Sequence, residues 1–333
     1  MNSFGTIFRV HIFGESHGPS VGITLDGCPA GIPLSAADFV HDIERRKGGT
    51  QLGTTPRKED DIPIFLSGVF NDTTTGAPLT IIFENNNTRS NDYTKQRTTP
   101  RPGHADFTAS IKMGGFEDYR GGGHFSGRLT VCLVAAGVIA KKILALKNIH
   151  CSAILKEVGG EADIEKGIAN AVALGDSVGG IVECVTTNVP VGLGEPFFNS
   201  AESLISHAVF AIPAIKGIEF GSGFAAAKMY GSTHNDAIQN KEGVTLTNHA
   251  AGIVGGITNG NEIIFRVAVK PTSSTPKVQQ TYDNQADTVV PFSVKGRHDL
   301  CIALRVPVVL EAVTSMVLVD LLMLEQQVGR VIK

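Results

Sequence analysis

The chain has 333 residues, 42% of them hydrophobic and 18% charged, a composition typical of a globular protein with a substantial core. Its 29 Lys and Arg against 32 Asp and Glu give a net charge of −3, so it lacks the basic excess used for non-specific nucleic-acid binding. Five cysteines without a C-x-x-C pair indicate free thiols in a reducing compartment. Residues 1–18 show no export signal, and we expect a cytoplasmic protein with no nucleic-acid partner.

The N-terminal third is predicted to consist mainly of short strands. Between them, a helix is expected to begin at the capping-box pattern Ser35–Asp38 and to end near Arg45-Arg46-Lys47, ahead of two glycines. The stretch 85–104 is polar and irregular, which in a compact domain often indicates a functional segment. The predicted strands, each bounded by turn residues, are 6–13, 19–26, 62–70 and 78–84.

Two strongly apolar stretches, 129–146 and 306–324, are predicted to be buried helices. Lysines interrupt the first and two acidic residues interrupt the second, so neither supplies the ~20 uncharged residues of a membrane span. We expect no membrane partner, and the nearly all-round apolar character of 129–146 predicts burial on several sides. Further along the chain, amphipathic helices are predicted at 161–175 and 201–211, and strands at 152–158, 179–187, 216–220 and 262–269.

The order of these elements favours an α+β fold. Strands and helices do not alternate regularly and no GxGxxG follows a strand, which disfavours a dinucleotide-binding Rossmann domain. No Pro/Ser-rich linker divides the chain, so we expect a single large domain over 1–333. A Gly-Gly-Ile sequence precedes a strand in both 177–185 and 251–258, which suggests an internal pseudo-duplication.

Six of the ten histidines lie in short polar or glycine-flanked motifs. Those with the strongest functional signal are His17 in ESHG and His104 in PGHAD, because each has a neighbouring glycine that permits close approach to a ligand. A His-Asp metal site remains an alternative, although the sequence has no H-x-x-x-H and no cysteine pair. A structural role remains open for the others, His234 and His124 in particular.

The arginines are concentrated before residue 129, and several of them adjoin glycine or proline. Guanidinium groups bind carboxylate and phosphate in bidentate fashion, so this pattern favours a small ligand with several anionic groups. The segment KPTSST (270–275) could contribute hydroxyl and backbone N–H groups to a phosphate. The glycine run in DYRGGGHFSGR (118–128) is expected to place backbone N–H groups at the start of a buried helix, where an anion binds favourably.

Taken together, several motifs closely resemble the chorismate synthase family, in order from Phe4 to about Leu322. They include FGESHG (13–18), DIERRKGGT (42–50), RSNDY (89–93), RPGHAD (101–106), DYRGGG (118–123), NHAAGIVGGI (248–257), KPTSS (270–274) and GRHD (296–299). The resemblance implies core helices packed between antiparallel sheets, and a homotetramer. It also implies a lyase that eliminates phosphate from 5-enolpyruvylshikimate 3-phosphate in a 1,4-anti reaction with no net redox change.

The same resemblance assigns roles to individual residues. Catalysis would use His17, His104 and Asp299, and substrate would be bound by Ser16, Arg45, Arg46, Arg101 and Arg128. Reduced FMN is the implied cofactor, NADPH is a candidate reductant and an external flavin reductase is a candidate partner. The residues implied to bind cofactor are Arg46, His124, Phe125, Ser126, Pro213, Ala214, Gly255, Lys270, Pro271, Thr272, Ser273, Ser274 and Arg297.

The chain departs from the family pattern at a few cofactor-binding positions. His124 and Phe125 stand where the commoner pattern has arginine and serine, which predicts that this loop holds the flavin by stacking and shape more than by charge. Leu52 stands where an arginine associated with NADPH is usual. Two rival interpretations remain: a metal-dependent phosphohydrolase that uses the His-Asp pairs, and a non-catalytic anion-binding protein of the same fold.

Overall fold

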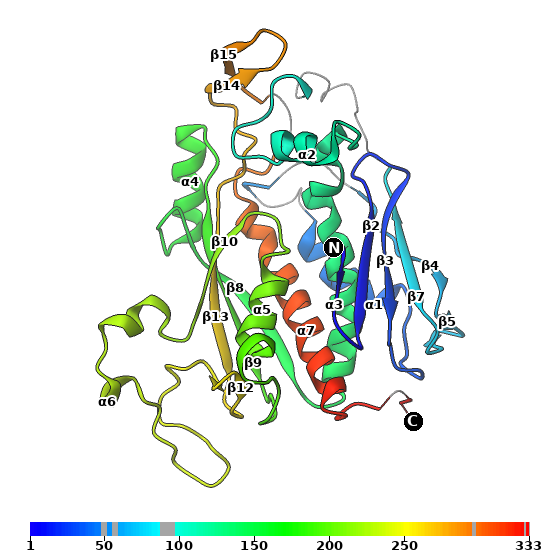
Figure 1. Ribbon diagram of the computed structural model, residues 1–333, viewed down its shortest axis with the longest axis vertical. Coiled ribbons are helices and arrows are strands. Elements are labelled where there is room, and N and C mark those ends of the chain that lie inside the picture. Colours follow the sequence, from blue (N-terminus) through cyan, green and yellow to red (C-terminus); the bar gives the residue numbers. More distant parts are fainter. Residues whose placement is uncertain (48–51, 55–58, 87–96, 295–297, 330, 333) are drawn as a thin grey trace.

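The computed structural model describes residues 1–47, 52–54, 59–86, 97–294, 298–329 and 331–332. Two helices, α3 (Thr130–Ala145) and α7 (Val306–Leu324), occupy the middle of the molecule, between two antiparallel sheets (Figure 1). This arrangement confirms the predicted α+β class. The other helices are α1 (Ala37–Arg46), α2 (Asp106–Met113), α4 (Ile164–Leu174), α5 (Ala201–Val209) and α6 (Gly231–His234).

The first sheet is built from the N-terminal quarter of the chain. Its order is β1-β2-β3-β7-β4, and the bounds are Ser3–Phe4, Arg9–Gly14, Ser20–Asp26, Leu79–Glu84 and Ile64–Ser67. The predicted strand 62–70 is divided at Gly68, whose φ is +83° and where a Cβ would lie 2.5 Å from the Leu79 Cα. Only glycine fits that backbone and that space, so the chain bends there and β5 (Val69–Phe70) pairs with β6 (Thr73–Thr74) instead.

The second sheet covers the other side of the helices. Its order is β10-β13-β9-β8, with the bounds Ile215–Phe220, Ile263–Val269, Gly180–Thr187 and His150–Val158. Alternate residues of β13 are buried against the helices, as a sheet with one covered face requires. Two further hairpins are β11–β12 (Ile253–Val254, Ile257–Thr258) and β14–β15 (Gln279–Asp283, Thr288–Phe292).

Several local predictions are corrected by the structure. Helix α2 and the β14–β15 hairpin were not predicted, because both are short and lack a long apolar period. Only half of the expected capping box forms: Asp38 accepts from the Ser35 backbone N–H at 2.7 Å, but Ser35 is not the cap residue of α1. Of the two Gly-Gly-Ile sequences, one leads into β9 and the other into the two-residue β12, and the pseudo-duplication stays a prediction.

The core of the protein is the contact between α3 and α7, which lie side by side between the sheets (Figure 1). Most residues of α3 and nearly all residues of α7 are buried, as predicted from their apolar sequences. By length and composition the stretch Ile302–Leu324 could also span a membrane, but 94% of its most apolar window is buried inside the protein. Among the described residues this helix is therefore the centre of a protein core.

Gly137 allows the closest approach of the two helices. A Cβ at this position would lie 2.2 Å from the Ala312 Cβ and 2.5 Å from its Cα. An alanine there would have to push α3 and α7 apart, because both obstructing atoms belong to or adjoin the backbone of α7.

Gly137→Ala is therefore expected to lower the free energy of unfolding by about 1–2 kcal/mol, although alanine favours helix by about 1 kcal/mol in open surroundings. Denaturant unfolding measures the change. Gly231→Ala in α6 is the matched control, because a Cβ there would meet no heavy atom within 4 Å; it should be neutral or slightly stabilising. Equal effects of the two substitutions would contradict this packing argument.

One buried carboxylate ties the helices to the second sheet. Glu311 of α7 binds Arg45 of α1 through two 2.7 Å contacts and Lys141 of α3 through another 2.7 Å contact, and it accepts the Ala153 N–H of β8 at 2.9 Å. Burial opposes ionisation of Glu311, but these cationic partners hold the pKa of its carboxyl below the usual value.

Glu311→Gln should destabilise the protein by about 2 kcal/mol at pH 7, because it removes one of the two carboxylates, Glu311 and Asp42, that the partly buried Arg45 and Lys141 share. Since the folded-state pKa is depressed, the stabilisation by Glu311 is present above its ordinary pKa of about 4.3 and is lost as pH falls through the lower, folded value. The difference between variant and wild type should therefore shrink in acid. Glu161→Gln removes an exposed partner of Lys166 and should cause no measurable change.

Candidate functional site

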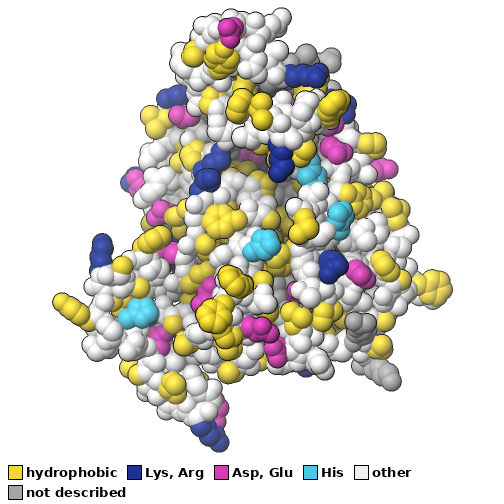
Figure 2. Space-filling model, in the orientation of Figure 1, with side chains coloured by type: hydrophobic (Ala, Val, Ile, Leu, Met, Phe, Trp, Pro, Cys, Tyr) yellow, Lys and Arg dark blue, Asp and Glu magenta, His cyan; other side chains and the backbone are white. Residues whose placement is uncertain are grey.

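A cavity of about 730 Å³ opens where α1 ends and where α3 and α7 begin, and its volume lies in the range usual for small-molecule sites. Side chains of the helical core form an apolar wall, among them Leu133, Ile212 and Met316. On the face drawn in Figure 2, basic side chains and histidines border a hollow beneath α2. The cavity therefore combines a flat apolar wall with a polar, cationic rim.

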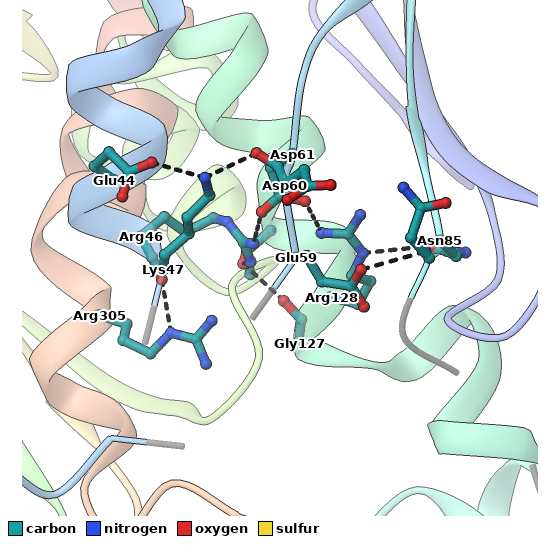
Figure 3. A network of polar contacts seen from close by, with 12 residues as sticks. Glu44, Arg46, Lys47, Glu59, Asp60, Asp61, Asn85, Gly127, Arg128 and Arg305 are labelled. Atoms are coloured by element: carbon teal, nitrogen blue, oxygen red, sulfur yellow. Dashed lines mark hydrogen bonds and ion pairs between the residues drawn. The ribbon is translucent and has the colours of Figure 1, made fainter. Parts of the chain in front are cut away.

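Two arginines of this cavity share one buried carboxylate. Arg46 Nη2 contacts Asp61 Oδ2 at 2.6 Å, and Arg128 Nη1 contacts Asp61 Oδ1; Figure 3 shows both side chains pointing toward Asp61. Burial raises the pKa of the Asp61 carboxyl, but the two guanidinium groups outweigh this effect and hold it below its usual value. Burial lowers the pKa of Arg46 to about 10, and the nearby Arg305 and Arg128 act in the same direction.

A third arginine, Arg305, closes the same cluster from the start of α7. Its Nε donates to the Arg46 carbonyl at 2.7 Å, and its Nη1 contacts Asp299 Oδ2 at 2.9 Å. Asp299, a predicted catalytic residue, is thus held by an ion pair at the cavity wall. Arg305 was not singled out from the sequence, where only its position shortly after GRHD pointed to it.

The charge balance of the cavity favours an anionic ligand. Among the described lining residues, six are lysine or arginine and three are aspartate or glutamate, which leaves an excess of three positive charges with histidine neutral. The N-terminal ends of α3 and α7 also lie at the cavity, where Thr130 and Val306 line it, and their dipoles add positive potential. An anion that enters would be stabilised from several sides.

His104 belongs to a compact network at the start of α2. Its Nδ1 lies 2.6 Å from Asp106 Oδ1, and Arg101 forks onto both oxygens of the same carboxylate at 2.7 Å. Burial opposes ionisation of Asp106, but hydrogen bonds from Arg101 and His104 hold its pKa well below the usual range. His104 and Arg101 line the cavity, so a histidine, an arginine and an ionised aspartate form one unit of its wall.

The glycine turn at 121–123 lies between the two predicted catalytic histidines. A Cβ at Gly121 would lie 2.6 Å from His17 Nε2, and a Cβ at Gly122 would lie 3.2 Å from His104 Cε1. All three glycines have positive φ. This corrects the expected role of the run: the glycines do not lie at the N-terminus of α3 but precede it by several residues, and they bring the backbone close to both imidazoles.

The segment 270–274 packs against the turn that carries His104. Lys270 Nζ and Ser273 Oγ both donate to the Gly103 carbonyl, at 2.9 and 2.7 Å. Burial and the neighbouring Lys216 lower the pKa of the Lys270 ammonium. Thr272 Oγ1 is buried and has no hydrogen-bond partner among the described residues, and it lines the cavity, so it is available to a bound ligand.

The structure brings most of the predicted site residues together. Ser16 and His17 lie directly behind Gly121, and the buried Ser16 Oγ lacks a hydrogen-bond partner within the described parts of the chain. The predicted residues that line the cavity itself are Arg46, Arg101, His104, His124, Phe125, Ser126, Arg128, Pro213, Ala214, Lys270, Pro271, Thr272, Ser273, Ser274 and Asp299.

Other predicted residues lie elsewhere. Arg45 points to a different side of α1 from Arg46 and is bound by Glu311, which gives it a structural contact instead of a place on the cavity wall. Gly255 lies in the β11–β12 turn and does not line the cavity, and neither does the exposed Leu52. Arg297 lies outside the described residues.

At the departures from the family pattern, the structure shows what the replacement residues contact. His124 Nδ1 lies 2.8 Å from the Gly14 carbonyl, and its Nε2 lies 3.2 Å from Asn2 Oδ1. The N-terminal residues Met1–Phe4 thereby become part of the cavity wall, a role that their sequence did not indicate. Phe125 is 40% exposed and lines the same cavity, a position suited to stacking.

The metal alternative gains no geometric support from the described residues, where no group of three or more His, Cys, Asp or Glu side chains is arranged to hold an ion. Asp106 and Asp299, the acidic members of the two His-Asp motifs, are instead bound to Arg101 and Arg305. Asp61 and Arg305 were not singled out from the sequence. Asp61 neutralises the predicted Arg46 and Arg128, and Arg305 orients the predicted Asp299.

Comparisons with known proteins point to one family. The family model described as chorismate synthase matches residues 8–323. A chorismate synthase of Chitinophaga pinensis is 68% identical over 333 residues, covering 100% of both chains, and one of Dehalococcoides mccartyi is 43% identical over 361 residues, covering 100% of this chain and 99% of the relative. A crystal structure of a chorismate synthase superposes with a TM-score of 0.75 at 26% identity, covering 98% of this chain and 95% of that one.

The contact between the glycine turn and His17 can be tested separately from backbone strain. Gly121→Ala should displace the His17 ring and lower the thermal unfolding midpoint, because a Cβ would lie well inside van der Waals contact. Gly175→Ala is the matched control: its φ of +61° equals the +60° of Gly121 within a degree, but a Cβ there would meet nothing within 4 Å. If both variants lose the same stability, strain alone explains the glycine and the proposed contact is wrong.

Proposed function

The chain belongs to the chorismate synthase family, and from that membership we propose that it converts 5-enolpyruvylshikimate 3-phosphate to chorismate by 1,4-anti elimination of phosphate, with reduced FMN and no net redox change. As a member of this family it is a lyase. The observation that carries the specific proposal is the cationic cavity with His104 on its wall and His17 across a glycine turn.

The charges of the cavity suit this substrate, which has two carboxylates and a phosphate. Arg46 and Arg128 share one carboxylate, Asp61, so each guanidinium retains donors for a ligand. Elimination is fast only if negative charge is neutralised as phosphate departs. Fixed guanidinium groups and the N-terminal ends of α3 and α7 supply that neutralisation without reorganising during the reaction.

The residues around the cavity also fit reduced FMN. Leu133, Ile212 and Met316 provide an apolar wall for a planar ring system, and the unpartnered Thr272 Oγ1 can bond to a polar edge or to the phosphate. Phe125 can stack on the ring. When bound, the flavin supplies electron density transiently to the substrate as the carbon–oxygen bond to phosphate breaks.

Proton transfer is assigned to the two histidines and Asp299. His17 and His104 are assigned between them the protonation of the departing phosphate and of the flavin. Asp106 occupies the Nδ1 side of His104, so His104 would exchange its proton at Nε2, and His17 is buried behind Gly121. Asp299 takes part in removal of the ring proton, and its ion pair with Arg305 fixes the position of the carboxylate.

Assembly, location and electron supply are part of the same proposal. We infer a homotetramer in the cytoplasm, with NADPH or an external flavin reductase as the source of electrons. Exposed aromatic side chains would be available for subunit contacts; they are Phe197, Phe198, Phe224 and Tyr230. Turnover with NADPH and FMN in air, without an added reductase, distinguishes the two electron sources.

Purified protein with reduced FMN, kept anaerobic, should release phosphate from 5-enolpyruvylshikimate 3-phosphate. His104→Ala and His17→Ala should each slow turnover by about 10²- to 10⁴-fold, the usual contribution of a positioned acid or base. His150→Ala on the exposed edge of β8 is the control and should leave turnover unchanged.

Two results would overturn the proposal. One is phosphate release by flavin-free protein on addition of a divalent metal, combined with none in the presence of reduced FMN. The other is full activity of both histidine variants, which would remove the assigned roles even if the overall reaction were correct.

A further inference from the structure

The Nδ1 atom of His104 faces the carboxylate of Asp106 and is therefore not available to a ligand. Asp106 Oδ1 lies 2.6 Å away, and an ionised carboxylate offers only acceptors. Nδ1 must therefore carry a hydrogen, since two lone pairs would otherwise meet at that distance. The proton that His104 exchanges with a ligand must then be at Nε2.

The nearby Arg101 does not compete for this nitrogen. Arg101 Nη2 lies 3.0 Å from His104 Nδ1, but a guanidinium has only donors, and the same Nη2 donates to Asp106 Oδ1 at 2.7 Å. Both nitrogens thus converge on one oxygen. Their proximity to each other is a consequence of the shared acceptor.

Asp106 is held rigidly enough to act as a template. It is the first residue of α2, it accepts the Arg101 backbone N–H at 3.1 Å and the Arg101 Nε at 2.7 Å, and its side chain is 11% exposed. The turn between Arg101 and Asp106 is also held in place by Lys270 and Ser273, which both donate hydrogen bonds to the Gly103 carbonyl. These contacts together fix the orientation of the imidazole.

The opposite edge of the ring meets backbone without side chains. A Cβ at Gly122 would lie 3.4 Å from His104 Nε2 and 3.2 Å from Cε1, so the glycine turn leaves room for this edge. His104 lines the main cavity and also a smaller one of about 210 Å³, whose wall includes Asp106 and Phe125. The Nδ1 edge is closed by Asp106, and the Nε2 edge is the one left for a ligand.

We propose that Asp106 is a positioning residue for His104: its carboxylate fixes the Nδ1–H tautomer, aims Nε2 at the ligand and stabilises the ring when Nε2 is also protonated. The kinetic part rests on the proposed elimination reaction, whereas the tautomer is a property of the protein without substrate. No metal or covalent step is involved. Removing the carboxylate that orients a metal-binding histidine typically lowers activity by about 10- to 100-fold, and we expect a loss of the same order for His104.

The first measurement is the tautomer of His104 in unliganded protein. Nitrogen-15 NMR of histidine-labelled protein, with the His104 signals identified by their loss in His104→Gln, should show hydrogen on Nδ1 in the wild type. Asp106→Leu should abolish this preference, whereas Asp106→Asn should retain it, because its amide oxygen can still accept. An unchanged spectrum in Asp106→Leu would overturn the proposal, whether or not the enzyme has the proposed activity.

The second measurement, steady-state kinetics, distinguishes positioning of His104 by Asp106 from a role of Asp106 that is limited to holding Arg101. Asp106→Asn should lower kcat by about 10- to 100-fold, and it should lower kcat again when it is introduced into an Arg101→Lys background. Asp106→Glu should recover part of the loss. The alternative is that Asp106 only holds Arg101 in place for substrate binding. In that case Asp106→Asn would raise KM and preserve kcat, and it would have no further effect in an Arg101→Lys background. That result would overturn the proposal.

Glu219→Gln is the matched control for these variants. Glu219 is also a carboxylate paired with an arginine, Arg266, at 3.2 Å, but it does not line the cavity. Its substitution should leave both the His104 tautomer and kcat unchanged. An equal loss of kcat in this control would show that the effect of Asp106→Asn is general destabilisation and would count against the proposal.

Discussion

The close contact of α3 and α7 is the constraint on which the site depends. Because Gly137 of α3 meets Ala312 of α7 almost backbone to backbone, the two helices stay adjacent along their length and begin at the same end of the molecule (Figure 1). Arg128 lies in the 3-10 turn Gly127–Leu129 that leads into α3, and Arg305 directly precedes α7. The packing of the apolar core thereby delivers two cations and two helix N-termini to one place, and α1 adds Arg46 from its C-terminal end.

Such a concentration of positive charge would be unfavourable without a counter-charge. Asp61 supplies it with a single carboxylate, which contacts both Arg46 and Arg128 (Figure 3). One anion between two buried cations fixes the geometry of both guanidinium groups and leaves the cluster net positive. A second carboxylate would satisfy the arginines fully and would also remove the attraction for an anionic ligand. The unequal pairing is therefore what makes the cluster suitable for binding.

The sequence predicted the elements that depend on local patterns, but not the side-chain contacts that depend on residues far along the chain. The buried helices and the main strands could be predicted, because apolar runs and alternation are local properties. Whether Arg45 or Arg46 faces the cavity could not, because neighbouring helical residues point about 100° apart and the partner of Arg45, Glu311, lies far along the chain. Asp61 and Arg305 were missed for a similar reason: each acquires its meaning only from long-range contacts.

The glycine run shows how a local pattern can be correctly judged important and wrongly explained. Three consecutive glycines indicate special backbone geometry or close approach, and both are present: each has positive φ, and Gly121 and Gly122 face His17 and His104. The sequence could not identify the side chains next to the glycines, because His17 lies in the turn between β2 and β3 and His104 lies in the turn before α2. With no Cβ atoms between them, a single segment of backbone fits between the two imidazoles. Asp106 complements this arrangement. The glycines leave the Nε2 edge of His104 open, and the contact of Asp106 with Nδ1 determines whether Nε2 carries a hydrogen.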